Sequence, residues 1–72
     1  MNENSELYVS YASDDNYACY MGISMLSLFE SNKDIENIVV YVLDYGIGDC
    51  NRQKLIEVAE KYQRTIVFTA VD

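Results

Sequence analysis

The sequence predicts an α/β fold, a Rossmann-like β-α-β-α-β unit with a parallel sheet. Three short segments rich in aromatic, β-branched and other apolar residues alternate with two segments whose apolar residues recur every three or four positions. Strands that alternate with helices of this length pair in parallel through right-handed crossovers. In such folds a ligand binds beyond the carboxyl ends of the strands.

Three strands are expected, at residues 7–12, 38–43 and 65–71. The first and third are rich in the residues that favour strands. The second, IVVYVL, is a continuous apolar run, which is typical of a strand buried on both faces. Residues 1–6 are polar and are expected to form a tail before the folded part, at 7–72.

The first helix is expected from Tyr17 to about Ser31. Any of Asp14, Asp15 and Asn16 could cap it by accepting a hydrogen bond from a free N–H group. We expect Gly22 to pack closely against the sheet. The apolar face comprises Ala18, Met21, Gly22, Met25, Leu28 and Phe29.

The second helix is expected from about Asp49 to Gln63, after the turn 44–49. Gly48 is expected to be the residue that caps it, and Asp49 lies in its first turn, where negative charge suits the helix dipole. Its buried face is predicted to comprise Leu55, Val58, Ala59 and Tyr62.

Composition excludes several classes of function. The 72 residues form one domain at most, and the net charge of −7 argues against nucleic acid or an anionic membrane surface as a partner. Without histidine, no Ser-His or Cys-His nucleophile is possible within these residues. No signal pattern or membrane-spanning run is evident, so a cytoplasmic location is expected. Cys19 and Cys50 are expected to be free thiols packed as small apolar residues, with a disulfide as the alternative.

The segment after the first strand holds the main candidate site residues. The carboxylates of Asp14 and Asp15 can accept a hydrogen bond from a base N–H group or help to hold a cation. Asn16 can bond a ribose hydroxyl, and Tyr17 offers a ring to stack on a base. The alternative is structural: a helix cap, a solvated acid and a core aromatic ring.

Two other features are weaker candidates. The G-x-G within residues 44–49 follows the second strand and lacks a third glycine, so we interpret it as a turn rather than a dinucleotide fingerprint. Asp72, with Asp14 and Asp15, would be needed for a receiver-like phospho-acceptor site. A terminal acid without function is the favoured interpretation of Asp72.

The strings Y-V-S-Y-A-S-D-D-N-Y-A at residues 8–18 and I-V-V-Y-V-L-D-Y-G-I at 38–47, followed by N-R-Q-K-L at 51–55, together resemble the opening of glycosyltransferase family 8. This family includes lipopolysaccharide galactosyl- and glucosyltransferases and glycogenin. The resemblance extends from Leu7 onward. It implies the Rossmann-like half of a GT-A fold, a UDP-sugar donor, retaining transfer and a divalent metal, usually Mn²⁺.

By position, the resemblance assigns UDP contacts to four residues. Ala12 would meet the uracil through its backbone, and Asp14 would accept from the uracil N–H group. Asn16 would contact the ribose or phosphates, and Tyr17 would stack on the base. Gly48 stands where many relatives have Ser, which removes a capping hydroxyl.

The family's D-x-D metal motif and later metal-binding histidine are absent from these residues. We therefore expect a truncated, UDP-binding segment that is inactive on its own, with no catalytic or metal-binding residues. A bare sheet edge would also favour self-association or exchange of elements. The alternatives are a receiver-like signalling module, and a non-catalytic remnant or interaction module of the same fold.

Overall fold

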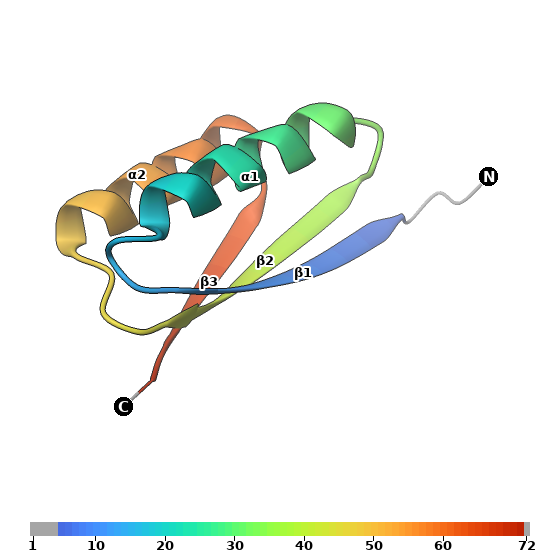
Figure 1. Ribbon diagram of the computed structural model, residues 1–72. Coiled ribbons are helices and arrows are strands. Elements are labelled where there is room, and N and C mark those ends of the chain that lie inside the picture. Colours follow the sequence, from blue (N-terminus) through green and yellow to red (C-terminus); the bar gives the residue numbers. More distant parts are fainter. Residues whose placement is uncertain (1–4, 72) are drawn as a thin grey trace.

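The computed structural model describes residues 5–71 and confirms the predicted β-α-β-α-β order (Figure 1). The expected tail at 1–6 falls mostly outside these residues, and the first strand begins at Glu6. The elements in order are β1 (Glu6–Ser13), α1 (Ala18–Ser31), β2 (Asn37–Asp44), α2 (Asp49–Lys61) and β3 (Thr65–Ala70).

The three strands form one parallel sheet in the order β1-β2-β3. The register pairs Ser13 with Asp44, and Asp44 with Ala70, so the strands end together. The loop from β1 to α1 and the loop from β2 to α2 therefore leave the same edge of the sheet side by side. This carboxyl edge is where a ligand is expected in such a sheet.

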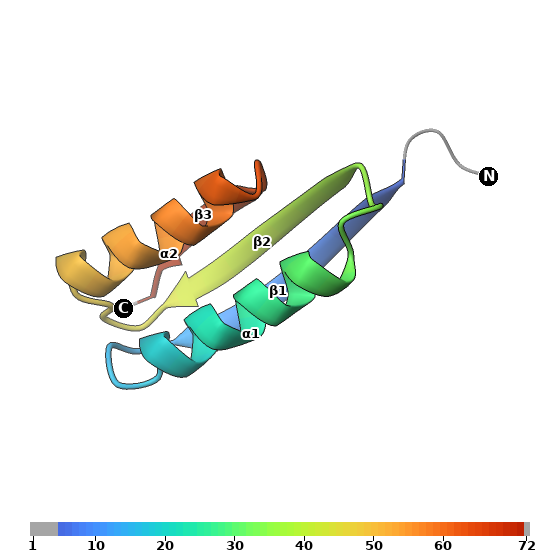
Figure 2. The same ribbon diagram turned by 90° about the horizontal axis from the view of Figure 1, so that it is seen from above.

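Both helices cover the same face of the sheet (Figures 1 and 2). Two right-handed crossovers that advance in the same direction across a sheet place their helices on one side. The expectation that residues 38–43 are buried on both faces is therefore wrong for this chain. Ile38, Val40 and Val42 lie under the helices, whereas Tyr41 and Leu43 on the opposite face are each 44% exposed.

The core lies between this face of the sheet and the two helices. From α1 it receives large side chains that are fully buried, and from α2 it receives Leu55 and Ala59. The ring of Tyr62 packs against that of Phe29, with 5.6 Å between the ring centroids. The buried hydrophobic residues are Ala18, Met21, Met25, Phe29, Ile38, Val40, Val42, Ile47, Leu55 and Ala59.

Two local expectations differ from what the structure contains. Cys19 and Cys50 are free, as expected, but both are exposed rather than packed, because each lies on the outer side of its helix one residue after the start. Gly22 approaches α2 rather than the sheet: a β-carbon there would lie 3.4 Å from Leu55 Cδ2.

None of the helices in residues 5–71 is long and apolar enough to cross a membrane.

The outer edges of β1 and β3 pair with no further strand within the described residues. Unpaired strand edges expose backbone donors and acceptors to other chains. Self-association through an edge consequently stays a prediction.

Because the core lies on one face of the sheet, substitutions at two residues of β2 should differ in their effect on stability. Replacing Ile38 by Ala should lower the free energy of unfolding by about 2–5 kcal/mol, because a buried side chain is lost and a cavity remains. Replacing Leu43 by Ala, on the other face of the same strand, should cost less than about 1 kcal/mol. Urea denaturation of both variants measures the difference, and equal losses would contradict a core confined to one face.

Candidate functional site

The two loops at the carboxyl edge of the sheet enclose a shallow cavity. The backbone N–H group of Tyr45 donates to the carbonyl oxygen of Ser13 at 2.9 Å, which joins the β2–α2 loop to the end of β1. The cavity has a volume of about 420 Å³. Its lining residues are Ala12, Ser13, Asp14, Tyr17 and Tyr45.

Asp14 and Tyr17 are held in place by the turn between β1 and α1. An oxygen of the Asp14 carboxylate accepts a hydrogen bond from the Tyr17 N–H group at 2.9 Å. The Ser13 hydroxyl donates to the Asp14 carbonyl oxygen at 2.8 Å. Tyr17 precedes the first residue of α1 and is 51% exposed, so its ring does not belong to the core. The turn thus presents a carboxylate and an aromatic ring to the same cavity.

Asp15 connects the first loop to α2. One of its carboxylate oxygens accepts from the Gly48 N–H group at 2.8 Å and from the Asn51 side-chain amide at 2.9 Å. Gly48 is the N-cap residue of α2 and has no side chain that could accept from the first turn of the helix, and Asp15 binds the N–H group of Gly48 itself. The hydrogen bond from Gly48, followed by that from Asn51, holds the pKa of Asp15 below its ordinary value.

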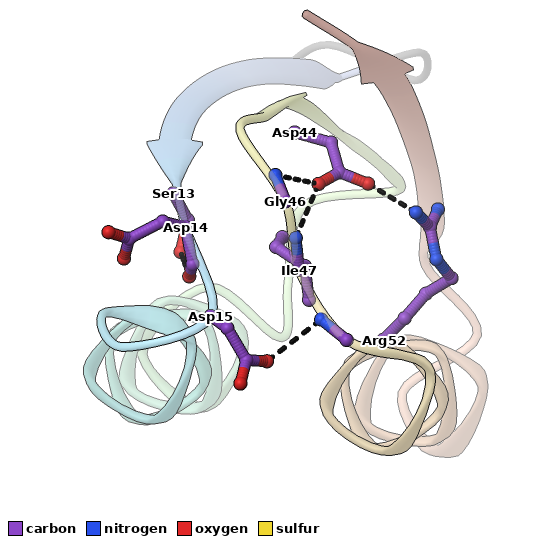
Figure 3. A network of polar contacts seen from close by, with 8 residues as sticks. Ser13, Asp14, Asp15, Asp44, Gly46, Ile47 and Arg52 are labelled. Atoms are coloured by element: carbon purple, nitrogen blue, oxygen red, sulfur yellow. Dashed lines mark hydrogen bonds and ion pairs between the residues drawn. The ribbon is translucent and has the colours of Figure 1, made fainter.

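Asp44, the last residue of β2, is buried with 4% of its surface exposed. One carboxylate oxygen accepts from the N–H groups of Ile47 at 2.7 Å and Gly46 at 2.9 Å. The other oxygen forms an ion pair with Arg52 (Figure 3). The Arg52 guanidinium also lies over the Phe68 ring. The Ile47 and Gly46 amides, and then Arg52, hold the pKa of Asp44 below its ordinary value against the opposing effect of burial.

Of the four predicted UDP contacts, Ala12, Asp14 and Tyr17 line the cavity. Asn16 is exposed in the same turn but does not line it. The sequence reasoning missed Tyr45 and Asp44. Both could have been identified from the sequence, because an acid at the end of the central strand is followed there by a turn that contains glycine.

The paired acids do not converge as a receiver-like site would require. Figure 3 shows the Asp14 carboxylate pointing away from α2 and the Asp15 carboxylate pointing toward it. Asp72, the third acid of that alternative, lies outside the described residues. Within residues 5–71, no group of three or more His, Cys, Asp or Glu side chains could hold a metal ion.

A second and larger cavity, of about 530 Å³, lies at the opposite edge of the sheet. There the Arg64 guanidinium donates to the carbonyl oxygens of Glu36 at 3.0 Å and Asn32 at 3.2 Å. These bonds join the loops at that edge, so Arg64 has a structural role. Because ligands of parallel α/β sheets bind at the carboxyl edge, the smaller cavity is the candidate site.

Comparison with known proteins relates this chain to glycosyltransferases. No family model matches it. Over all 72 residues it is 31% identical to general stress protein A of Bacillus subtilis (strain 168), and it spans 25% of that relative. Galactosyltransferase LgtC, solved with donor and acceptor sugar analogs and also as an active-site mutant, matches with a TM-score of 0.80 and 32% identity. That match covers 90% of this chain and 23% of LgtC.

The bifunctional glycosyltransferase WbbM, solved in its apo form, has the same fold over 94% of this chain and 12% of its own length. Its TM-score is also 0.80, at 24% identity. The chain therefore resembles the N-terminal portion of family 8 glycosyltransferases, with the Rossmann-like half of their GT-A fold. It spans about a quarter or less of the length of each of these proteins.

The Asp44 contacts predict how stability depends on pH. Because the pKa of Asp44 is lowered in the folded chain, its contribution is present above the unfolded carboxyl pKa of about 4 and is lost as pH falls through the lower, folded value. Asp44→Asn should be less stable near neutral pH and should lose less further stability between about pH 5 and pH 2. Urea denaturation across pH measures this, with exposed Asp34→Asn as control; parallel profiles for wild type and Asp44→Asn would contradict it.

The contact between Asp15 and Gly48 predicts that the effect of Gly48→Ala on stability depends on the residue at position 15. A β-carbon at position 48 would lie 3.0 Å from the Asp15 carboxylate oxygen, so Gly48→Ala must displace Asp15. In an Asp15→Ala chain that conflict is gone, and Gly48→Ala should be close to neutral, because the N-cap position favours Gly over Ala while the change reduces the freedom of the unfolded chain. In the wild type Gly48→Ala should be more destabilising. A double-mutant cycle measures the coupling, and the same change in both backgrounds would exclude it.

Proposed function

We propose that this chain forms the UDP-binding part of a sugar-nucleotide-dependent glycosyltransferase. The observation that carries the proposal is that one cavity at the carboxyl edge is lined by Ala12, Asp14 and Tyr17. These are three of the four residues to which the sequence resemblance assigns UDP contacts. The similarity to LgtC and WbbM supports the glycosyltransferase class.

Asp14 is the group that would distinguish uracil from other bases. A carboxylate accepts several hydrogen bonds, and the turn uses one of them for the Tyr17 N–H group. The remaining acceptor positions suit the N–H group of uracil. Adenine has no ring N–H group at the corresponding place, so the same carboxylate favours UDP over ADP.

Tyr17 and the start of α1 would hold the rest of the nucleotide. The half-exposed Tyr17 ring offers a face on which a base can stack. The first N–H groups of an α-helix lack partners within the helix and carry partial positive charge, which favours phosphate groups in an otherwise acidic chain. Asn16, which is exposed in the same turn, would contact a ribose hydroxyl or a phosphate.

The resemblance also implies a divalent metal, usually Mn²⁺, and retaining transfer. The described residues do not fit a metal site by themselves, because their acidic side chains do not gather in groups of three. The proposed binding therefore uses hydrogen bonds, stacking and the positive end of the α1 dipole. The family's D-x-D motif is absent from the sequence, so the proposal for residues 5–71 is nucleotide binding without turnover.

The test is a titration of isotope-labelled chain with UDP, with ADP as control and Mn²⁺ in both, followed through backbone amides by NMR. Saturable shifts at residues 12–17, stronger with UDP than with ADP, are expected. Asp14→Asn should weaken UDP binding about fivefold and reduce the preference over ADP, because a hydrogen bond to a charged acceptor contributes about 1 kcal/mol more than a neutral one.

Asp34→Asn is the matched control, because Asp34 is an exposed acid beside the opposite cavity and should leave UDP binding unchanged. A well-folded chain with no shift at residues 12–17 would refute UDP binding. That outcome would favour a non-catalytic module of the same fold.

A further inference from the structure

Tyr45 lines the candidate cavity but has no part in the function derived above. It lies in the loop between β2 and α2, whereas the residues assigned to UDP all come from the end of β1 and the turn that follows. The Tyr45 side chain is 54% exposed. Tyr side chains are enriched at interfaces, because the ring offers apolar contact area while the hydroxyl stays in water.

The backbone on both sides of Tyr45 is fixed. Its own N–H group donates to the Ser13 carbonyl oxygen at 2.9 Å. The buried Asp44 carboxylate, one residue earlier, accepts from the N–H groups of Gly46 and Ile47, the two residues that follow Tyr45. The side chain of Ile47 is buried in the core. Only the two side-chain torsions of Tyr45 stay free, so ordering its ring on a ligand costs little entropy.

The two aromatic residues of the cavity differ in their aromatic neighbours. Tyr17, the other aromatic residue of the cavity, lies against Tyr20 with 6.0 Å between ring centroids. Among the described residues Tyr45 pairs with no other ring. The cavity therefore has one ring at the start of α1 and a second ring supplied by the neighbouring loop.

We propose that Tyr45 is a second aromatic wall of the nucleotide site, and that the base lies between Tyr45 and Tyr17. This inference rests on the proposed function. Stacking acts on any base, since every base has an aromatic face. Tyr45 thus contributes affinity for nucleotides in general, while Asp14 contributes the preference for uracil. A bound base would also join the β1–α1 and β2–α2 loops to each other.

The experiment compares UDP and ADP titrations of the wild-type chain, Tyr45→Ala, Tyr45→Phe and Tyr8→Ala. Tyr8, 59% exposed toward the other end of β1, is the matched control. Tyr45→Ala should weaken UDP binding about tenfold, weaken ADP binding by a similar factor and leave the ratio of the two unchanged. Tyr45→Phe and Tyr8→Ala should bind as the wild type does.

A second readout follows the ring protons of Tyr45 by NMR. UDP should shift them upfield through the ring current of the base, whereas ribose 5-phosphate, which has no base, should not. If UDP binds the wild type but Tyr45→Ala binds equally well, the inference is overturned and the proposed function stands. If a folded wild-type chain binds no UDP, both are overturned together.

Discussion

The buried carboxylate of Asp44 is the interaction on which the carboxyl edge of this molecule depends. A charge taken out of water is costly unless it is fully hydrogen-bonded. Asp44 satisfies its two oxygens with the amides of Gly46 and Ile47 and with the Arg52 guanidinium. These contacts curl the chain directly after β2, direct Ile47 into the core and fix where α2 begins. One buried acid thereby sets the shape of the loop that borders the candidate site.

The two loops at this edge are joined by hydrogen bonds between them. Tyr45 donates its N–H group to the end of β1, and Asp15 accepts that of Gly48 at the start of α2. The absence of a side chain at Gly48 allows this approach, since a β-carbon would crowd the carboxylate. Asp15 is a structural link, which leaves Asp14 as the acid that faces the cavity.

The chain carries a strongly one-sided core. Its helices cover one face of the sheet, while the opposite face exposes Tyr8, Tyr41, Leu43 and Val67. The rings of Tyr8 and Tyr41 stack on each other there with 6.3 Å between centroids. The apolar run at residues 38–43 is typical of a strand buried on both faces, but within the described residues it is buried on one face only. The hydrophobicity of the sequence shows which side chains a strand could bury, whereas the position of the helices decides which of them are buried.

The sequence by itself determined the order and type of all five elements, because the apolar spacing differs so clearly between strands and helices. It also determined that Ala12, Asp14 and Tyr17 belong to one end of a strand. Only the tertiary structure showed that Asp15 binds the N–H group before α2 and that Tyr45 lies beside the cavity. Those facts depend on the parallel register that brings Ser13 level with Asp44. No local pattern specifies a contact between two loops about thirty residues apart, because it arises when the strands pair.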